Sequence, residues 1–300
     1  MIDPVAFSIG PIQVHWYGIL IAAAALFGTL LATRVARWLG EDPDQAWSML
    51  LIVMLFAIAG ARLYHVIHMW DHYAANPAEI PQIWNGGIGI PGGIAGGALG
   101  VLVYTRLNGL NTARWLDIAA PALLLGQAIG RLGNFVNQEL YGPPTAVCGT
   151  QGFPPCLPWG IQIDEAHRIG TSWDAASFPV DSTQFVPLFA YEAILNLIGM
   201  AILLFVIRRF GPRLFTGDIV LMYLIWYGAV RTLLETYRVN NWTILGLPTA
   251  MWLGIVAVVL SAAWLIIRHR RGWGTPLIRP ADDGEADAPA AQPQAEPSAG

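Results

Sequence analysis

Residues 116–142 read LDIAAPALLLGQAIGRLGNFVNQELYG, an apolar stretch that ends in an arginine, two asparagines, a glutamine and a glutamate. Ionisable and polar groups are costly in hydrocarbon, so a membrane segment that keeps them marks a functional site more often than a scaffold. The stretch therefore predicts a membrane helix with a chemical site at its end.

The composition indicates an integral membrane protein. Of the 300 residues, 55% are hydrophobic and 12% are charged, and the mean hydropathy is +0.50; such values favour a membrane protein. The first apolar run lacks the basic start and the cleavage site of a removable signal peptide. We expect an all-α polytopic fold, because seven runs reach the roughly 20 residues that a spanning helix needs. These runs cover 17–37, 48–68, 88–107, 116–136, 187–207, 218–237 and 247–267.

The basic residues predict the orientation, and all of them are arginine, since the chain has no lysine. Arginine clusters follow the first, third, fifth and seventh runs, so they fall on one side of the membrane. The positive-inside rule makes that side cytoplasmic, which places the N-terminus outside and the C-terminus inside. The net charge of −4 gives no indication of a nucleic-acid partner.

The outside loop at about 140–186 is rich in proline and carries the two cysteines, Cys148 and Cys156. We expect an ordered extracytoplasmic head and favour a structural disulfide over a reactive or metal-binding role, because an oxidising compartment permits the bond and no histidine stands at ligand spacing. Residues 281–300 are dominated by Ala, Pro, Gln, Asp and Glu, so we expect a disordered tail after a membrane domain at 1–280.

Three polar residues of the fourth run share one helix face, because Gln127, Arg131 and Asn134 are four and three residues apart. A buried arginine needs a partner, and a structural pairing with Glu139 or Glu192 is the alternative to a substrate site. The number of polar groups in so few residues favours the site.

The sixth run carries Arg231, Glu235 and Arg238 as a charged stripe on one face. Two arginines around one glutamate leave a net positive charge, and the planar guanidinium suits bidentate binding of phosphate oxygens. An intrahelical salt bridge is an equal alternative for the stripe alone, but Arg131 adds weight to the anion site.

The second and third runs allow more than one interpretation. Arg62 is followed by His65 and His68 at a spacing of three, but no cluster of carboxylates or cysteines completes a coordination shell, so we expect no metal. The glycines around Gly92 and Gly93 are compatible with close helix packing and with a helix broken at Pro91 that turns backbone N–H groups toward an anion, and the two interpretations do not conflict. Tyr17, beside Trp16, reads by itself as an interfacial aromatic anchor.

The sequence also resembles a known family. The run GRLGNFVNQELYG at 130–142 is similar to the signature of bacterial prolipoprotein diacylglyceryl transferases. Further matching pieces follow in the family's order over about 15–270, with a composition similar to members from high-GC actinobacteria. They are Trp16-Tyr17-Gly18, Gly60-Ala61-Arg62-Leu63, the glycine-rich third run, Tyr191-Glu192, and Arg231 with Glu235 and Arg238.

The resemblance implies an enzyme of the bacterial plasma membrane, without a metal or organic cofactor. It would move the diacylglyceryl group of phosphatidylglycerol to the lipobox cysteine of a prolipoprotein signal peptide and release glycerol-1-phosphate. We expect catalysis from Arg131, Arg231, Tyr17 and Glu139. The residues expected to bind substrate are Arg131, Asn134, Gly142, Arg231, Glu235, Arg238, Gly92, Gly93 and Arg62.

The chain departs from the resemblance at Pro91 and Val186, where many members carry histidine. The histidine at the first of these positions has been assigned a base role, so either another group activates the thiol here or that assignment is not general. A transporter or channel for an anionic solute is the rival prediction, since paired arginines also suit an anion path, but the sequence has no inverted repeat.

Overall fold

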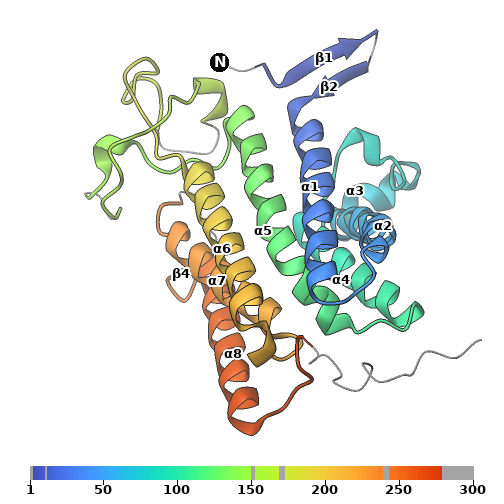
Figure 1. Cartoon of the computed structure of the whole chain (residues 1–300). Coiled ribbons are helices and arrows are strands. Elements are labelled where there is room, and N and C mark those ends of the chain that lie inside the picture. The colour runs from blue at the N-terminus through green and yellow to red at the C-terminus, as the bar shows by residue number, and fades with distance from the viewer. Residues whose placement is uncertain (1–2, 11, 150–152, 169–172, 239–242, 279–300) are drawn as a thin grey trace, which may run out of the picture.

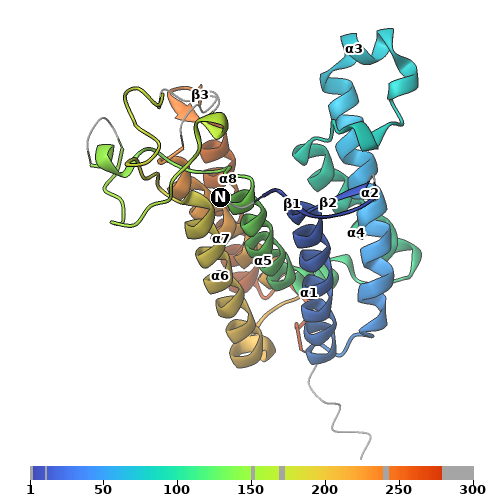
Figure 2. The same ribbon diagram turned by 90° about the horizontal axis from the view of Figure 1, so that it is seen from above.

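The computed structural model describes residues 3–10, 12–149, 153–168, 173–238 and 243–278. The predicted disordered tail at 281–300 lies outside these residues. The described part of the molecule contains seven helices of 18 residues or more (Figures 1 and 2). They are α1 (Trp16–Trp38), α2 (Asp44–His68), α4 (Ile90–Leu107), α5 (Thr112–Val136), α6 (Leu188–Phe210), α7 (Asp218–Glu235) and α8 (Thr249–Arg271).

Short elements join the long helices. Between α2 and α4 stand α3 (Trp70–Ala75) and two turns of 3₁₀-helix, η1 (Pro77–Glu79) and η2 (Ile83–Asn85). The remaining 3₁₀ turns are η3 (Thr145–Val147), η4 (Glu165–His167) and η5 (Gly211–Arg213). The expectation of an all-α fold missed two small antiparallel hairpins. These are β1 (Val5–Ile9) with β2 (Ile12–His15), and β3 (Thr243–Ile244) with β4 (Leu247–Pro248).

Five of the seven long helices are long and apolar enough to cross a membrane, namely α1, α2, α4, α6 and α8. The predicted spans at 116–136 and 218–237 form helices of sufficient length, α5 and α7, but these two fall short of the same criteria of composition. Arg131 lies in α5, whereas Arg231 and Glu235 lie in α7. The helices that depart most from a plain membrane span are therefore those that carry the predicted site.

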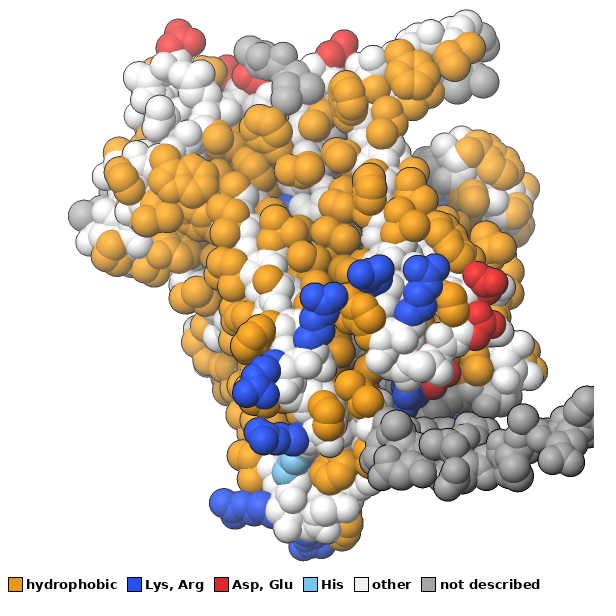
Figure 3. Space-filling model, viewed as in Figure 1, with side chains coloured by type: hydrophobic (Ala, Val, Ile, Leu, Met, Phe, Trp, Pro, Cys, Tyr) orange, Lys and Arg blue, Asp and Glu red, His pale blue; other side chains and the backbone are white. Residues whose placement is uncertain are grey.

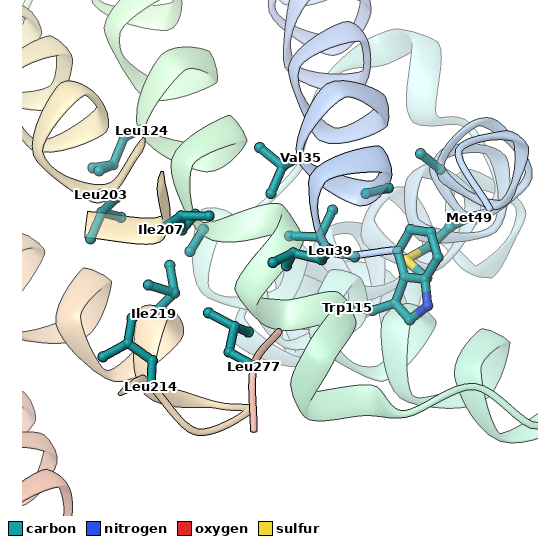
Figure 4. Close-up of a cluster of buried hydrophobic side chains, with 14 of the residues drawn as sticks. Val35, Leu39, Met49, Trp115, Leu124, Leu203, Ile207, Leu214, Ile219 and Leu277 are labelled. Carbon is teal, nitrogen blue, oxygen red and sulfur yellow. The ribbon is translucent and has the colours of Figure 1, made fainter. Parts of the chain in front are cut away.

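α5 is the central helix, and it packs against α1, α6 and α7 (Figure 1). Toward the end of the bundle where α1 ends, buried side chains from these helices form one core (Figure 4). Trp115 and Leu124 contribute from α5, and Leu277 reaches the core from the segment after α8. This core fixes the position of α5 relative to its neighbours.

A buried carboxylate joins α5 to the start of α7. Asp117 is fully buried and accepts hydrogen bonds from the backbone N–H groups of Gly217 at 2.5 Å and Val220 at 2.9 Å. The first N–H groups of a helix have no partner within it, so Asp117 satisfies donors that would otherwise be unpaired in an apolar setting. This contact sets the height of α7 against α5.

The second and fourth helices meet through glycine. A Cβ added at Gly92 would lie 2.2 Å from the carbonyl oxygen of Gly60, and one at Gly96 would lie 2.2 Å from that of Phe56. Close approach through small residues was one of the two interpretations of this segment, and it is confirmed. The predicted break at Pro91 is wrong, because α4 runs without interruption from Ile90 and Pro91 stands in its first turn, where a missing N–H costs nothing.

The loop predicted as a head is ordered over its described residues. Val147, Ile163, Trp173 and Phe185 form a small buried core of its own. The buried Arg168 donates to the carbonyls of Ile163 and Phe178 at 2.9 and 2.6 Å. The backbone N–H of Ser177 donates to Asp174 and lowers the pKa of that exposed carboxyl. Cys148 and Cys156 form the predicted disulfide.

The glycine contact yields a prediction that separates two neighbouring residues. Gly92→Ala should lower the free energy of unfolding by about 1–3 kcal/mol, because the new methyl group collides with the backbone of α2. The matched control is Gly93→Ala, where the nearest atom, the Cβ of Ala61, lies 3.6 Å from the new Cβ. The measurement is thermal unfolding of both variants in one detergent. Equal destabilisation of the two would contradict the tight approach at Gly92.

Candidate functional site

The end of α5 holds Arg131 between an amide and a carboxylate. The Nη1 atom of Arg131 donates to the Oδ1 of Asn134 at 3.0 Å, and its Nη2 atom forms an ion pair with the Oε1 of Glu192. Glu192 lies in the first turns of α6 and its side chain is 6% exposed. Of the two carboxylates that the sequence offered as partners for Arg131, the structure selects Glu192.

A second group of charges lies at the end of α7. Glu235 is buried and pairs with Arg231 at 3.1 Å and with Arg238 at 3.8 Å. Arg131 and Glu192 lie close enough to Arg238 for their charges to act on it. We call these five residues, Arg131, Glu192, Arg231, Glu235 and Arg238, the arginine cluster. With three positive and two negative charges, it carries a net charge of +1.

The cluster presents its positive groups outward. The side chains of Arg131, Arg231 and Arg238 are 24%, 20% and 29% exposed, while those of Glu192 and Glu235 are 6% and 3% exposed. The carboxylates thus stand behind the guanidinium groups and hold them in place. A partly desolvated cationic surface of this kind suits an anion with several oxygen atoms, such as a phosphate.

The chain that leaves α5 is strained and tightly held. Gln138 and Leu140 have φ of 51° and 56°, in a region of backbone conformation that few residues other than glycine, asparagine and aspartate adopt. Between them the exposed Glu139 accepts hydrogen bonds from Asn137 at 2.7 Å and from Asn134 at 3.5 Å. Asn134 therefore connects Glu139 to Arg131, and the strained turn keeps this carboxylate beside the cluster.

Contacts with the head and with the segment that follows α7 fix this turn. Gln138 and Asp164 exchange hydrogen bonds at 2.6 and 2.8 Å. The N–H of Gly142 donates to the carbonyl of Val186 at 2.8 Å, and a Cβ at this glycine would lie 3.2 Å from the carbonyl oxygen of Tyr237. Gly142 thus allows the turn to pack against the residue that precedes Arg238.

Tyr17 also reaches this region. It lies in the first turn of α1 with 42% of its surface exposed, and its ring packs on Gly133 so closely that a Cβ there would lie 2.6 Å from the ring. Since Gly133 is two residues from Arg131, the tyrosine flanks the same end of α5. The anchor and the catalytic interpretations of Tyr17 are both compatible with this position.

The structure does not bring the remaining predicted residues into the cluster. Arg62 is buried and its guanidinium donates to backbone carbonyls, those of Glu79, Ile80, Gly86 and Gly87, under the ring of Tyr73. Gly92 and Gly93 lie in the contact between α2 and α4. A role for these three residues in substrate binding stays a prediction. Among the described residues no group of histidine, cysteine and carboxylate side chains is suited to hold a metal ion.

Asn196, a buried polar residue one turn from Glu192, is not among the residues that the sequence predicts for the site. Asn196 is fully buried and follows Glu192 by one turn on the same face of α6. On α5, Gln127 stands one turn before Arg131 and donates to the hydroxyl of Tyr223 at 2.8 Å. The spacing of four residues from Glu192 was the available signal, but it required knowledge that Glu192 belongs to the site.

These features define a polytopic membrane protein with a cationic site where α5, α6 and α7 meet. The family model described as prolipoprotein diacylglyceryl transferase matches residues 4–267. A relative from Chloroflexus aggregans, named phosphatidylglycerol–prolipoprotein diacylglyceryl transferase, is 39% identical over 92% of this chain and 92% of its own length. Proteins of the same name from Streptococcus equi subsp. equi and Streptococcus mutans are each 36% identical, over 90% of this chain and 97% and 96% of their own lengths. The chain belongs to the prolipoprotein diacylglyceryl transferase family.

The ion pair between Arg131 and Glu192 can be tested through stability. Glu192→Leu leaves the charge of Arg131 without its carboxylate partner and should lower the free energy of unfolding by about 2–3 kcal/mol. The loss is smaller than for a fully buried pair because the arginine is partly exposed. The double variant Arg131→Met with Glu192→Leu should recover most of this loss, since two packed apolar side chains replace the pair. The measurement is unfolding in a single detergent. A double variant less stable than Glu192→Leu alone would contradict the pairing.

Proposed function

We propose that the protein transfers the diacylglyceryl group of phosphatidylglycerol to the lipobox cysteine thiol of a prolipoprotein, the first step of lipoprotein maturation. The observation that carries the proposal is the arginine cluster, in which three partly exposed arginines stand in front of two buried glutamates. Family membership and the names of the relatives support the same reaction. None of the comparisons supports the alternative of an anion transporter.

In the proposed reaction the phosphodiester of the lipid binds to Arg131 and Arg231. The thiolate sulfur attacks C3 of the glyceryl group, a carbon–sulfur bond forms, and the bond from that carbon to the phosphate oxygen breaks. The electron pair leaves with the phosphate as glycerol-1-phosphate. Fixed guanidinium groups stabilise the charge that grows on this leaving oxygen, and they need little reorganisation because Glu192 and Glu235 already hold them.

The thiol has to lose its proton, because the thiolate is the nucleophile. The net positive charge of the cluster favours ionisation of a thiol nearby. Glu139 is the group suited to accept the proton, since it is exposed, lies beside Arg131 through Asn134, and is held by two asparagine amides. Tyr17, on the other side of Gly133, is placed to contact the lipid or the peptide.

The proposed setting is the bacterial plasma membrane, crossed seven times by α1, α2, α4, α5, α6, α7 and α8, with the N-terminus outside. Residues 1–280 form the catalytic membrane domain, with the head at about 140–186 outside the cell. Exposed arginines gather toward one end of the bundle, below a broad apolar surface, on the face shown in Figure 3. This distribution supports a cytoplasmic location for that end. The arginine cluster then lies near the outer surface.

Loss of either central arginine should abolish or nearly abolish the transfer. Arg131→Ala and Arg231→Ala should each lower the rate by a factor of roughly 100–1000, equivalent to about 3–4 kcal/mol, because a preorganised donor to the developing charge is removed. Lysine should restore little, since it cannot form a bidentate fork. The assay is the mass gain of a lipobox peptide in vesicles that contain phosphatidylglycerol. Arg106→Ala, at the exposed end of α4, is the control. Near-normal transfer by either site variant would contradict the catalytic role assigned to that arginine.

Pro91 tests whether a base is needed at the start of α4. If the positive potential and Glu139 activate the thiol, Pro91→Ala should keep most of the activity, and the pH profile of Pro91→His should lack a new limb near ~6.5. The transfer rate is measured against pH for both variants and the parent in one lipid mixture. A large gain with histidine, together with such a limb, would show that the missing base limits the reaction.

A further inference from the structure

The hairpin between α7 and α8 carries a leucine at its tip. β3 and β4 pair through Ile244 and Leu247, and the two residues between them, Leu245 and Gly246, have φ of 51° and 78°. Leu245 is 88% exposed, the largest exposed fraction among the large hydrophobic residues that the structure describes.

Leucine is an unfavourable residue for this turn. A two-residue hairpin with positive φ at both central positions is a type I′ turn, which strongly prefers Asn-Gly or Asp-Gly. A leucine in the left-handed region is strained by the contact of its Cβ with the following carbonyl oxygen. Because Leu245 is almost fully exposed, burial within the protein does not offset this strain. Contact with an apolar phase outside the protein would offset it.

The position of the hairpin on α8 places it at the boundary of such a phase. α8 starts at Thr249, directly after β4, and its outward side chains include Leu253, Val256 and Leu260. The stretch 249–267 precedes Arg268 and, at about 1.5 Å per residue, is about 28 Å long. The hydrocarbon layer of a bilayer is about 30 Å thick, so the hairpin lies where that layer ends.

The hairpin is held firmly in this position. The indole Nε1 of Trp252, in the first turn of α8, donates to the carbonyl of Ile244 at 2.9 Å. Tryptophan is typical of the membrane–water interface. No charged residue stands between 243 and 267, so no charge separates the hairpin from the apolar surface of α8.

We propose that the Leu245 tip inserts into the outer boundary of the hydrocarbon layer and anchors the connection between α7 and α8 in lipid. α7 ends at Glu235, within the arginine cluster, so this anchor fixes the height of the cluster relative to the lipid headgroups. The partner of this surface is the bilayer itself. The inference rests on the membrane topology given under the proposed function, but not on the transfer reaction.

A depth measurement tests the anchor without any use of activity. The two native cysteines are joined in the disulfide, so Leu245→Cys introduces one reactive thiol for a nitroxide label. The labelled protein is placed in vesicles of phosphatidylcholine and phosphatidylglycerol. Collisions of the label with oxygen, which concentrates in lipid, are compared with collisions with a water-soluble nickel chelate. Leu253→Cys on α8 is the lipid control, and Ala176→Cys on the exposed surface of the head is the aqueous control.

The anchor predicts that the label at position 245 behaves as the label at 253 does, with oxygen collisions in excess. A label at 245 that behaves as the one at 176 does, while 253 stays in lipid, overturns the anchor and leaves the topology intact. A label at 253 that meets water overturns the membrane placement of α8 and the anchor with it. Both results are independent of whether the protein transfers a lipid group.

A second pair of variants separates insertion from folding. Leu245→Asn creates the preferred residue pair for the turn, so the hairpin should persist while its apolar tip is lost. With the label at Ile244→Cys, we expect this substitution to shift the balance between inserted and water-exposed hairpin by roughly tenfold toward water, the change that loss of one buried leucine side chain produces. An unchanged depth at position 244 would overturn the proposal.

Discussion

The pairing of arginines with buried carboxylates is the constraint on which the rest of this structure depends. Arg131 is held by Glu192 from another helix, and Arg231 by Glu235 from its own. A charge in an apolar environment is tolerated only with a partner, so α5 and α6 have to meet for Arg131 and Glu192 to pair, while α7, which carries its own pair, packs against both. The same arrangement leaves the guanidinium groups partly exposed and one positive charge in excess, which is the property a phosphate site requires.

Contacts on either side of the cluster preserve this arrangement. On the side of the head, the strained turn after α5 is tied to the head by Gln138 and Asp164. The hydroxyl of Tyr237 donates to the carbonyl of Pro155, next to the disulfide. On the opposite side, Asp117 holds the first turn of α7. The head is therefore a support for the site, because it fixes residues adjacent to both Glu139 and Arg238.

The glycine-rich segment shows how one pattern can carry two physical meanings. Glycines every four residues and a proline are compatible with a broken helix and with a closely packed one. The packed helix forms because α2 also carries a glycine, Gly60, opposite Gly92, so both backbones can approach. The role of Arg62 likewise depends on residues outside its own helix. Its guanidinium is engaged by the carbonyls of the segment before α4, and nothing in the local sequence indicates that those carbonyls turn toward it.

The sequence by itself determined the seven long helices and the faces that carry Arg131, Arg231 and Glu235, and it favoured the disulfide without deciding it. Hydropathy and helical spacing are local properties, so they can be read from the sequence without knowing which residues contact one another in the fold. Only the tertiary structure decided that Glu192 rather than Glu139 pairs with Arg131, that the carboxylates lie behind the arginines, and that Arg62 serves the segment before α4. These outcomes depend on contacts between residues far apart in the chain, and such contacts follow from the packing of helices, which no spacing within one helix specifies.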